Sequence, residues 1–163
     1  MNTTLKSLML TLAMLTAHAA CADDPAVERG RYLVKIGGCN DCHTPGYAQS
    51  GGKVPEAQWL SGVPLGFNGP WGTSYASNLR LSAQNITSAE QWLAYARAPR
   101  RPPMPWFGLR DMSDADLKAI YAYLRSAGPA GSAMPAALPP GTTPTTPYIV
   151  FVPQEPAKFA ASR

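Results

Sequence analysis

The distribution of apolar residues along the chain predicts three amphipathic helices. In each one, apolar residues recur three and four positions apart, which places them on one face of an α-helix. The first helix is expected from about Pro25 to Ile36, with Asp24 as its cap and proline at a position that suits it. Gly30 in its middle costs about 1 kcal/mol relative to alanine. A close approach of another helix would explain that glycine.

The second and third predicted helices follow sequences that resemble capping boxes. Thr87-Ser88-Ala89-Glu90 precedes the second, which Pro99 ends. Ser113-Asp114-Ala115-Asp116 precedes the third, which Gly128-Pro129 ends. The apolar stripe of the second helix is Ala89, Trp92, Leu93 and Ala96, and that of the third is Leu117, Ile120, Tyr121 and Leu124. Such stripes are typical of core packing.

The rest of the chain is rich in glycine and proline. The stretch from Gly46 to Gly72 is loop-like and holds seven of the fourteen glycines. A structureless loop of this length is unusual in a compact domain unless it serves a ligand. Residues 128–163 have many prolines and few charges, which predicts an extended or partly disordered tail. Within it, Tyr148-Ile149-Val150-Phe151-Val152 is apolar enough to pack on the domain or on a partner.

Residues 1–22 are typical of a secretory signal peptide. Lys6 supplies a positive charge, the apolar run that follows is too short to span a membrane, and Ala20-Cys21-Ala22 fits a cleavage site. The expected organisation is therefore a signal peptide over 1–22, one domain over 23–127 and a tail over 128–163, in a periplasmic protein. A lipid on Cys21 is the alternative, although His18 stands where an aliphatic residue is normal in that signal.

The strongest chemical motif is Cys39-Asn40-Asp41-Cys42-His43. The spacing C-x-x-C-H is typical of the attachment site of a c-type haem. Two thiols on one helical turn can add to the two vinyl groups of one porphyrin, and the next residue brings an imidazole to the iron. The rival readings are a chance cluster, a redox dithiol and half of a zinc site. A zinc site needs about four ligands, whereas the whole chain has three cysteines and two histidines.

The sixth iron ligand is predicted to be Met104. His18 lies in the signal peptide, which excludes a second imidazole in the mature chain. Met112 precedes the cap of the third helix and is expected to pack against Leu117 as a hydrophobic staple, and Met134 lies in the tail. Met104 lies in the segment Arg101-Pro102-Pro103-Met104-Pro105-Trp106, whose prolines stiffen the backbone. A thioether favours ferrous iron and raises the potential relative to a second imidazole.

Aromatic side chains of the glycine-rich stretch and its neighbours would wall the haem: Trp59, Phe67, Trp71 and Tyr75. The formal net charge of +4 is too small to suggest a nucleic-acid partner. Four arginines surround the Met104 segment: Arg97, Arg100, Arg101 and Arg110. They form either an ordinary solvated face or a basic rim that steers an acidic partner.

On these residues the chain resembles class I c-type cytochromes over roughly residues 25–127. The resemblance implies an all-α class I cytochrome c fold, with three main helices around one covalently bound haem, long loops and the proline-rich tail. It further implies that the first and last helices cross, so that Gly30 faces Tyr121 and Leu124. The carbonyl of Pro55 would orient His43.

The segment from Gly69 to Leu79 is similar to a haem-flanking segment in the cytochrome subunits of membrane-bound alcohol and aldehyde dehydrogenases, and it makes Asn78 a further haem-site candidate. Those subunits usually carry three haem modules, and this chain has one. Membrane association is expected only through a lipid on Cys21 or a membrane-bound partner complex.

Two functions fit the sequence. The first is a periplasmic carrier of single electrons between redox proteins, such as a dehydrogenase or an oxidase, or a subunit of such a complex. The second is a haem protein with a labile sixth ligand that binds or senses a small molecule. A haem enzyme fits less well, because the mature chain lacks a second histidine or a spare cysteine for most such chemistry.

Overall fold

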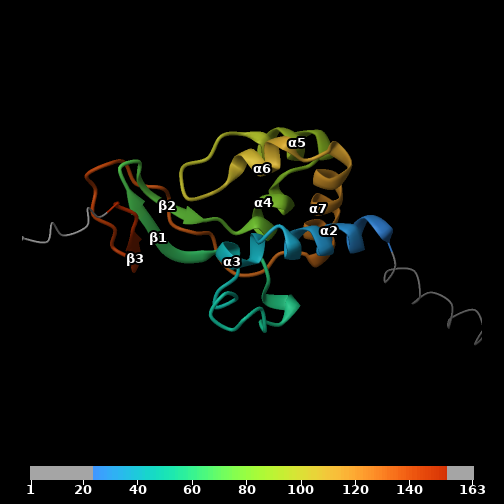
Figure 1. Cartoon of the computed structure of the whole chain (residues 1–163). Coiled ribbons are helices and arrows are strands. Elements are labelled where there is room, and N and C mark those ends of the chain that lie inside the picture. The colour runs from blue at the N-terminus through green and yellow to red at the C-terminus, as the bar shows by residue number, and fades with distance from the viewer. Residues whose placement is uncertain (1–23, 154–163) are drawn as a thin grey trace, which may run out of the picture.

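Two long helices form the frame of the molecule. The computed structural model describes residues 24–153, in which α2 (Pro25–Ile36) packs against α7 (Asp114–Ala127) (Figure 1). The Asp24 side chain accepts a hydrogen bond from the Ala26 amide (2.8 Å), so α2 begins where the sequence predicts. Ser113 caps α7 in the same way, by accepting from the Asp116 amide (3.1 Å).

The two helices approach most closely at Gly30. A Cβ atom on Gly30 would overlap the carbonyl oxygen of Ala119 and lie 2.8 Å from Cβ of Tyr123. The expected close helix contact is therefore confirmed, but the predicted partners, Tyr121 and Leu124, are wrong. Ala119 and Tyr123 share one face of α7 because they are four residues apart. Tyr121 points elsewhere and stacks on Trp92, with ring centroids 5.5 Å apart.

Besides α5, which is described below, residues 24–153 contain four shorter helical segments. They are α3 (Cys39–His43), the 3₁₀ helix η1 (Glu56–Gln58), α4 (Leu79–Asn85) and α6 (Trp106–Asp111). The sequence does not predict α4 and α6, because a helix of one or two turns shows too little periodicity. None of the helices in the described part of the chain is both long and apolar enough to cross a membrane.

The second predicted helix is α5 (Ala89–Arg97), and its cap differs from the expectation by one residue. Ser88 caps the helix, and its hydroxyl accepts from the Gln91 amide (3.2 Å). The Gln91 side chain in turn accepts from the backbone amide of Thr87 (3.1 Å). The N-cap is therefore Ser88 and not Thr87, and the side chain that reaches back is Gln91 and not Glu90, with the Thr87 amide as its donor.

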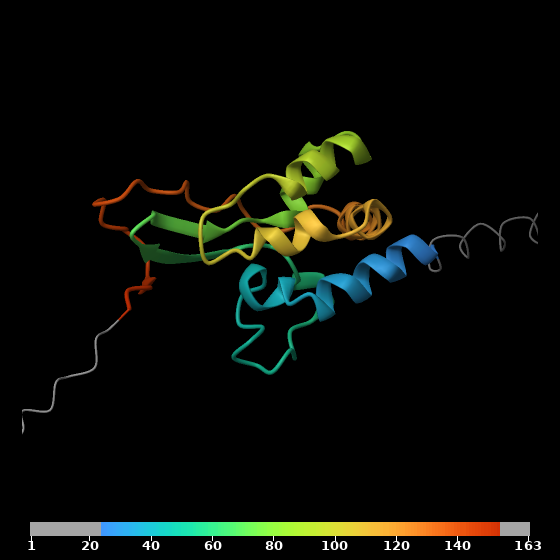
Figure 2. The same ribbon diagram turned by 45° about the horizontal axis from the view of Figure 1, so that its top comes forward.

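A small sheet corrects the all-α expectation. Strands β1 (Val63–Gly69) and β2 (Gly72–Ala76) form an antiparallel hairpin, and β3 (Tyr148–Val150) pairs in parallel with β1, giving the order β2-β1-β3. The sheet lies at the end of the molecule away from α2 and α7 (Figure 2). Its strands contain several glycines and a proline, which conceal the alternating pattern that predicts a strand.

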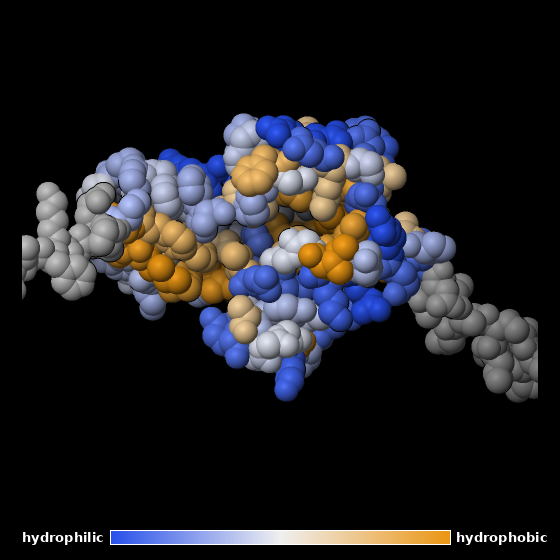
Figure 3. Space-filling model, in the orientation of Figure 1, coloured by the Kyte–Doolittle hydropathy of each residue, from blue (hydrophilic) through white to orange (hydrophobic). Residues whose placement is uncertain are grey.

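The segment after α7 follows the domain instead of leaving it. Thr73 and Leu138 exchange two backbone hydrogen bonds (3.0 and 2.9 Å), and β3 completes the sheet. The expectation that the apolar segment 148–152 packs on the domain is confirmed, although its side chains remain substantially exposed. Figure 3 shows hydrophobic side chains gathered over this end of the molecule. The signal peptide and residues 154–163 lie outside the described residues.

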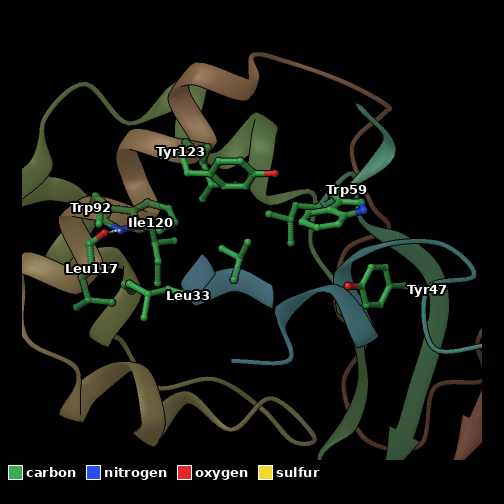
Figure 4. Close-up of a cluster of buried hydrophobic side chains, with 13 residues drawn as sticks. Leu33, Tyr47, Trp59, Trp92, Leu117, Ile120 and Tyr123 are labelled. Atoms are coloured by element: carbon green, nitrogen blue, oxygen red, sulfur yellow. Dashed lines mark hydrogen bonds between the residues drawn. The ribbon is translucent and has the colours of Figure 1, made fainter. Parts of the chain in front are cut away.

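The core is built from α2, α5 and α7, and it is extended by Ala83 of α4 and by Tyr47, Trp59 and Leu60 of the loop after α3 (Figure 4). Val34, Leu117 and Leu124 have no exposed surface at all. Trp92 is 4% exposed, and its indole nitrogen donates to the Leu117 carbonyl (2.8 Å). The one polar group of this large side chain is therefore satisfied inside the core.

Replacing Gly30 by alanine tests the helix contact. Because the new methyl group would overlap the α7 backbone, the variant is expected to lose about 1–3 kcal/mol of unfolding free energy. Gly108→Ala in α6 is the matched control, since no atom lies within 4 Å of its added Cβ. The control is expected to gain up to about 1 kcal/mol. Urea denaturation of both variants measures the difference, and equal stabilities would refute the close contact.

Candidate functional site

Helix α3 presents the Cys39, Cys42 and His43 side chains to one cavity of about 430 Å³. This volume is within the usual range of small-molecule and cofactor sites. Both cysteines are free thiols. Burial raises the pKa of Cys39 to about 11 and also raises the pKa of Cys42, so both are protonated at neutral pH.

The described part of the chain does not complete a zinc site. Among residues 24–153, no group of three or more histidine, cysteine, aspartate and glutamate side chains lies close enough together to hold a metal ion.

The imidazole of His43 is held by one hydrogen bond. Its Nδ1 lies 2.7 Å from the carbonyl oxygen of Ser77. A carbonyl only accepts, so Nδ1 carries the proton and donates, which leaves Nε2 with a free lone pair. Burial lowers the pKa of His43 and the contact with Ser77 opposes this, so the ring is neutral at neutral pH, as iron ligation requires.

The orienting carbonyl is therefore that of Ser77, and the expectation for Pro55 is wrong. The Pro55 carbonyl instead accepts from the Gln58 amide (2.9 Å) and starts η1. Ser77 follows directly after β2, and the hairpin brings this end of the strand over α3. The spacing of Pro55 in the sequence could not reveal this, because the hairpin itself was not predicted.

The loop that follows α3 holds this helix in place through hydrogen bonds. Thr44 donates from its hydroxyl to the Asn40 side-chain oxygen (2.7 Å) and accepts from the Leu60 amide (2.8 Å). The Gly62 amide donates to the His43 carbonyl (2.8 Å). Asn40 and Thr44 are almost completely buried. These two residues are not among those predicted from the sequence, although a polar pair four positions apart on a helix is a signal for side-chain hydrogen bonding.

The remaining walls of the cavity come from every part of the fold. Met104 and its neighbours Pro103 and Pro105 form one side. The segment that follows α7 (residues 128–153, here called the extension) contributes Pro135 and Ala137. The helices and the hairpin supply mostly apolar side chains: Val34, Leu79, Trp92, Ala96, Leu109, Ile120, Phe67, Ser74, Tyr75 and Ala76. An apolar, walled cavity with two thiols and an imidazole fits the flat ring of a haem.

Tyr75 and Phe67 line the cavity as expected, but Trp59, Trp71 and Asn78 do not. Trp59 packs edge-to-face on Tyr47 at 5.7 Å and donates to the Val54 carbonyl (2.8 Å). Trp71 folds back over the hairpin turn and donates to the Phe67 carbonyl (3.3 Å). The two tryptophans stabilise the loop and the hairpin, which in turn position the residues that do line the cavity.

Asn78 has a positioning role outside the cavity. Its side-chain oxygen caps α4 by accepting from the Leu81 amide (3.0 Å). Its amide nitrogen donates to the carbonyls of Ala130 (2.7 Å) and Ser132 (3.2 Å). One side chain therefore joins α4 to the start of the extension that supplies Pro135 and Ala137.

The four arginines around Met104 divide into two pairs. Arg97 forms an ion pair with Asp114 (2.6 Å), and Arg110 forms one with Asp111 (2.7 Å). Arg100 and Arg101 line the cavity. The positive charge near the cavity is thus concentrated in two of the four side chains.

The thiols, the neutral imidazole and the apolar walls together define a protein that holds a haem through covalent bonds. The chain belongs to the cytochrome c family, whose family model matches residues 27–128. The class I cytochrome fold expected from the sequence is supported in its helical part, and the sheet is added to it.

Several relatives are components of dehydrogenases. The chain is 32% identical over 120 residues to one of the subunits of nicotinate dehydrogenase from Pseudomonas putida, an alignment that covers 68% of this chain and 9% of the relative. It is 29% identical to the gluconate 2-dehydrogenase cytochrome c subunit of Pantoea cypripedii (73% and 28% covered). It is 27% identical to the quinone-dependent alcohol dehydrogenase cytochrome c subunit of Gluconobacter oxydans (71% and 24% covered).

The chain thus spans less than a third of the length of each of these relatives. No solved structure matches the chain. Family and site agree on one covalently attached haem c, held at Cys39 and Cys42 with His43 beside them. When bound, the haem supplies an iron that takes up and releases one electron. Membership of the cytochrome c family makes the chain an electron-transfer haem protein.

Substitutions of Asn78 separate its two roles, which are to cap α4 and to hold the start of the extension. Asn78→Ala removes both the cap and the amide donors, and it is expected to lower the unfolding free energy by about 1–2 kcal/mol. It is also expected to speed hydrogen exchange of the backbone amides in residues 130–138. Asn78→Ser keeps a capping oxygen and loses the donors, so it should speed the exchange with a smaller loss of stability. Unchanged exchange in both variants would refute the link to the extension.

Proposed function

We propose that this chain is a periplasmic carrier of single electrons whose haem iron is ligated by His43 and Met104. Its partners are redox proteins, with a dehydrogenase as electron donor. The observation that carries this proposal is that Cys39, Cys42, His43 and Met104 face one and the same cavity. The first three belong to one short helix, and Met104 comes from a segment more than sixty residues further along the chain.

Three features support Met104 over the other methionines of the mature chain. Met112 packs against the core cluster and ends α6. The Met134 side chain lies beside Gly62 and Asn78, and neither Met112 nor Met134 lines the cavity. The Met104 carbonyl accepts from the Trp106 amide (2.9 Å), which orders the turn that carries it.

The relatives support a dehydrogenase partner. Cytochrome subunits of gluconate, alcohol and fructose dehydrogenases are all similar to this chain. Those relatives are several times longer, so this protein's own donor is part of the proposal. A dehydrogenase removes two electrons from its substrate and must pass them on singly to a haem, which is the task of such a domain.

The location is supported by the first 22 residues, which have the charged start, apolar run and small-residue site of an export signal. Covalent haem attachment also consumes two thiols that would otherwise tend to form a disulfide in an oxidising compartment. A lipid on Cys21, or a membrane-bound partner complex, would bring the protein to the membrane surface.

Met104→Ala tests the axial ligand. The variant is expected to lose the sulfur-to-iron charge-transfer band of the oxidised protein and to bind carbon monoxide when reduced, because the sixth position opens. Met112→Ala is the matched control and should keep the band, since Met112 only packs against the core. The reverse pattern would contradict the assignment. If the unmodified reduced protein binds carbon monoxide readily, the sixth ligand is labile and the function is small-ligand binding.

Reduction by a dehydrogenase tests the carrier function. The oxidised protein is mixed with a purified periplasmic flavin- or quinone-dependent dehydrogenase and its substrate, and the reduced haem spectrum is followed in time. One electron per protein is the expected stoichiometry. The same mixture without the dehydrogenase's substrate is the control and is expected to leave the haem oxidised. Failure of every dehydrogenase that co-purifies with the protein would argue against a dehydrogenase donor.

A further inference from the structure

The end of the molecule that holds the sheet carries no charged side chain. Neither of the segments that contain it, residues 57–79 and residues 126–153, has an aspartate, glutamate, lysine, arginine or histidine. All the charged side chains of residues 24–153 belong to residues 24–56 and 80–125. Covering the sheet end with another surface therefore removes no charge from water, and charge is what makes most protein surfaces costly to bury.

Apolar side chains gather on this uncharged end (Figure 3). The rings of Phe67 in β1 and Phe151 after β3 lie 5.9 Å apart, and the Trp71 ring lies 6.3 Å from that of Phe151. Ile149 is the register partner of Phe67, so its side chain lies on the same face of the sheet. The residues of β3 are between 43% and 57% exposed. A surface without charge and rich in aromatic residues has the composition of the core of a protein interface.

The two edges of the sheet differ. At the β2 edge, Thr73 exchanges two backbone hydrogen bonds with Leu138 of the extension (3.0 and 2.9 Å), so this edge is covered. At the β3 edge, no further strand of residues 24–153 pairs with β3. An open edge is a template for another strand, so β3 is where the sheet can be extended.

The open edge offers unpaired backbone groups. Pro147 and Phe151 are both bonded to β1, through the Pro147 carbonyl (2.9 Å) and the Phe151 amide (2.7 Å). Alternate residues of a strand turn their backbone groups to the same side, so Ile149 also faces β1. The amides and carbonyls of Tyr148 and Val150 therefore point away from the sheet, and they have no backbone partner within residues 24–153.

The chemistry of this edge selects the kind of surface that covers it. A membrane fits poorly, because the unpaired backbone groups of an open edge are not tolerated in hydrocarbon. A charged protein surface also fits poorly, since its charges would lose water and find no opposite charge here. The matching surface is an uncharged, apolar strand edge. The β3 strand of a second copy is such an edge, and it offers the same backbone groups at the same spacing.

We propose that β3 pairs antiparallel with β3 of a second copy of this chain, so that the two sheets join across a two-fold axis. Tyr148 of each copy then exchanges both backbone hydrogen bonds with Val150 of the other copy. Ile149 lies at the axis and faces Ile149 of the second copy as a non-hydrogen-bonded pair, the kind in which opposite side chains are closest.

Two features of the chain limit this assembly to a pair. Pro147 and Pro153 bracket β3 and restrict strand pairing to the residues between them. Both outer edges of the joined sheet are β2 edges, which are already covered at Leu138, so the sheet offers no open edge to a third copy.

The pairing also sets where the two cavities lie. The two-fold axis is perpendicular to the sheet, so the face that carries Phe67, which lines the cavity, is on the same side in both copies. Phe67, Ile149 and their counterparts fall in line, which places the two Phe67 positions three strand spacings, or about 14 Å, apart. The dimer thus brings two haem domains side by side. That consequence for electron transfer rests on the proposed function, whereas the dimer itself does not.

Sedimentation equilibrium of the mature holoprotein over a range of concentrations tests the pairing. The unmodified protein is expected to be a dimer. Ile149→Lys places two like charges opposite each other and removes two apolar contacts, so the dissociation constant is expected to rise about a hundredfold. Ile36→Lys is the matched control, because it makes the same change at an isoleucine of α2 that is 60% exposed, and it is expected to leave the dimer intact.

A pair of opposite charges tests the symmetric register. Ile149→Glu alone is expected to be monomeric like Ile149→Lys, whereas an equimolar mixture of the two variants is expected to restore a dimer with one copy of each. Neither a folding defect nor a general loss of apolar surface produces that recovery. If Ile149→Lys alone stays dimeric, or if the mixture stays monomeric, a different contact forms the dimer and the proposal is overturned.

An unmodified protein that is monomeric at every concentration up to about 1 mM would also overturn the proposal. Three measurements then identify what covers β3 instead. Dimerisation of a chain that ends at Pro153 would assign the edge to residues 154–163, and binding to phosphatidylcholine vesicles would assign it to a membrane. Slower reduction of Ile149→Lys, but not of Ile36→Lys, by a dehydrogenase would assign it to that partner. The reduced haem spectrum of each sample reports haem attachment, so failure of the proposed function is distinguished from failure of the dimer.

Discussion

The backbone contact between α2 and α7 at Gly30 is the constraint on which the site depends. Because Gly30 has no side chain, the two helices pack at backbone distance, and the following Gly37-Gly38 turn then delivers α3 directly onto the core. The two thiols and the imidazole come from five consecutive residues, so placing one short helix places all three. A looser helix pair would move α3 away from Ile120 of α7, which lines the same cavity.

The hairpin and the extension enclose the side of the cavity that the helices leave open. The end of β2 supplies the carbonyl that orients His43, and the extension supplies Pro135 and Ala137. Nearby, Arg80 joins α4 to η1 and to the end of α7: it is 7% exposed and donates to the Ala57 carbonyl (2.7 Å), to the Gly128 carbonyl (2.7 Å) and to the Ala127 carbonyl. A buried cation at the end of α7 satisfies carbonyls that have no partner within the helix and complements the helix dipole.

The arginines around the haem site fall into two groups. On the outer surface, arginines such as Arg97 and Arg110 form exposed ion pairs, which contribute little to stability. Toward the cavity, Arg100 and Arg101 are held by backbone carbonyls, and within residues 24–153 neither forms an ion pair with an acidic side chain. An uncompensated cation beside an apolar cavity suits an anionic cofactor, because the cofactor itself supplies the missing negative charge.

The sequence by itself determined the three helices α2, α5 and α7 and the haem-attachment motif, and it singled out one methionine for the proposed ligation, since each depends on local spacing within a few residues. It also indicated, through Gly30, that two helices pack closely. Only the tertiary structure decided which residues meet across long separations: Ser77 and not Pro55 at His43, and Ala119 and not Leu124 at Gly30. The hairpin could not be predicted because its glycines and proline conceal the strand pattern. The contacts that depend on the hairpin could therefore not be predicted either. A periodic pattern records which face of an element is buried, but the partner of that face is set by how the elements pack.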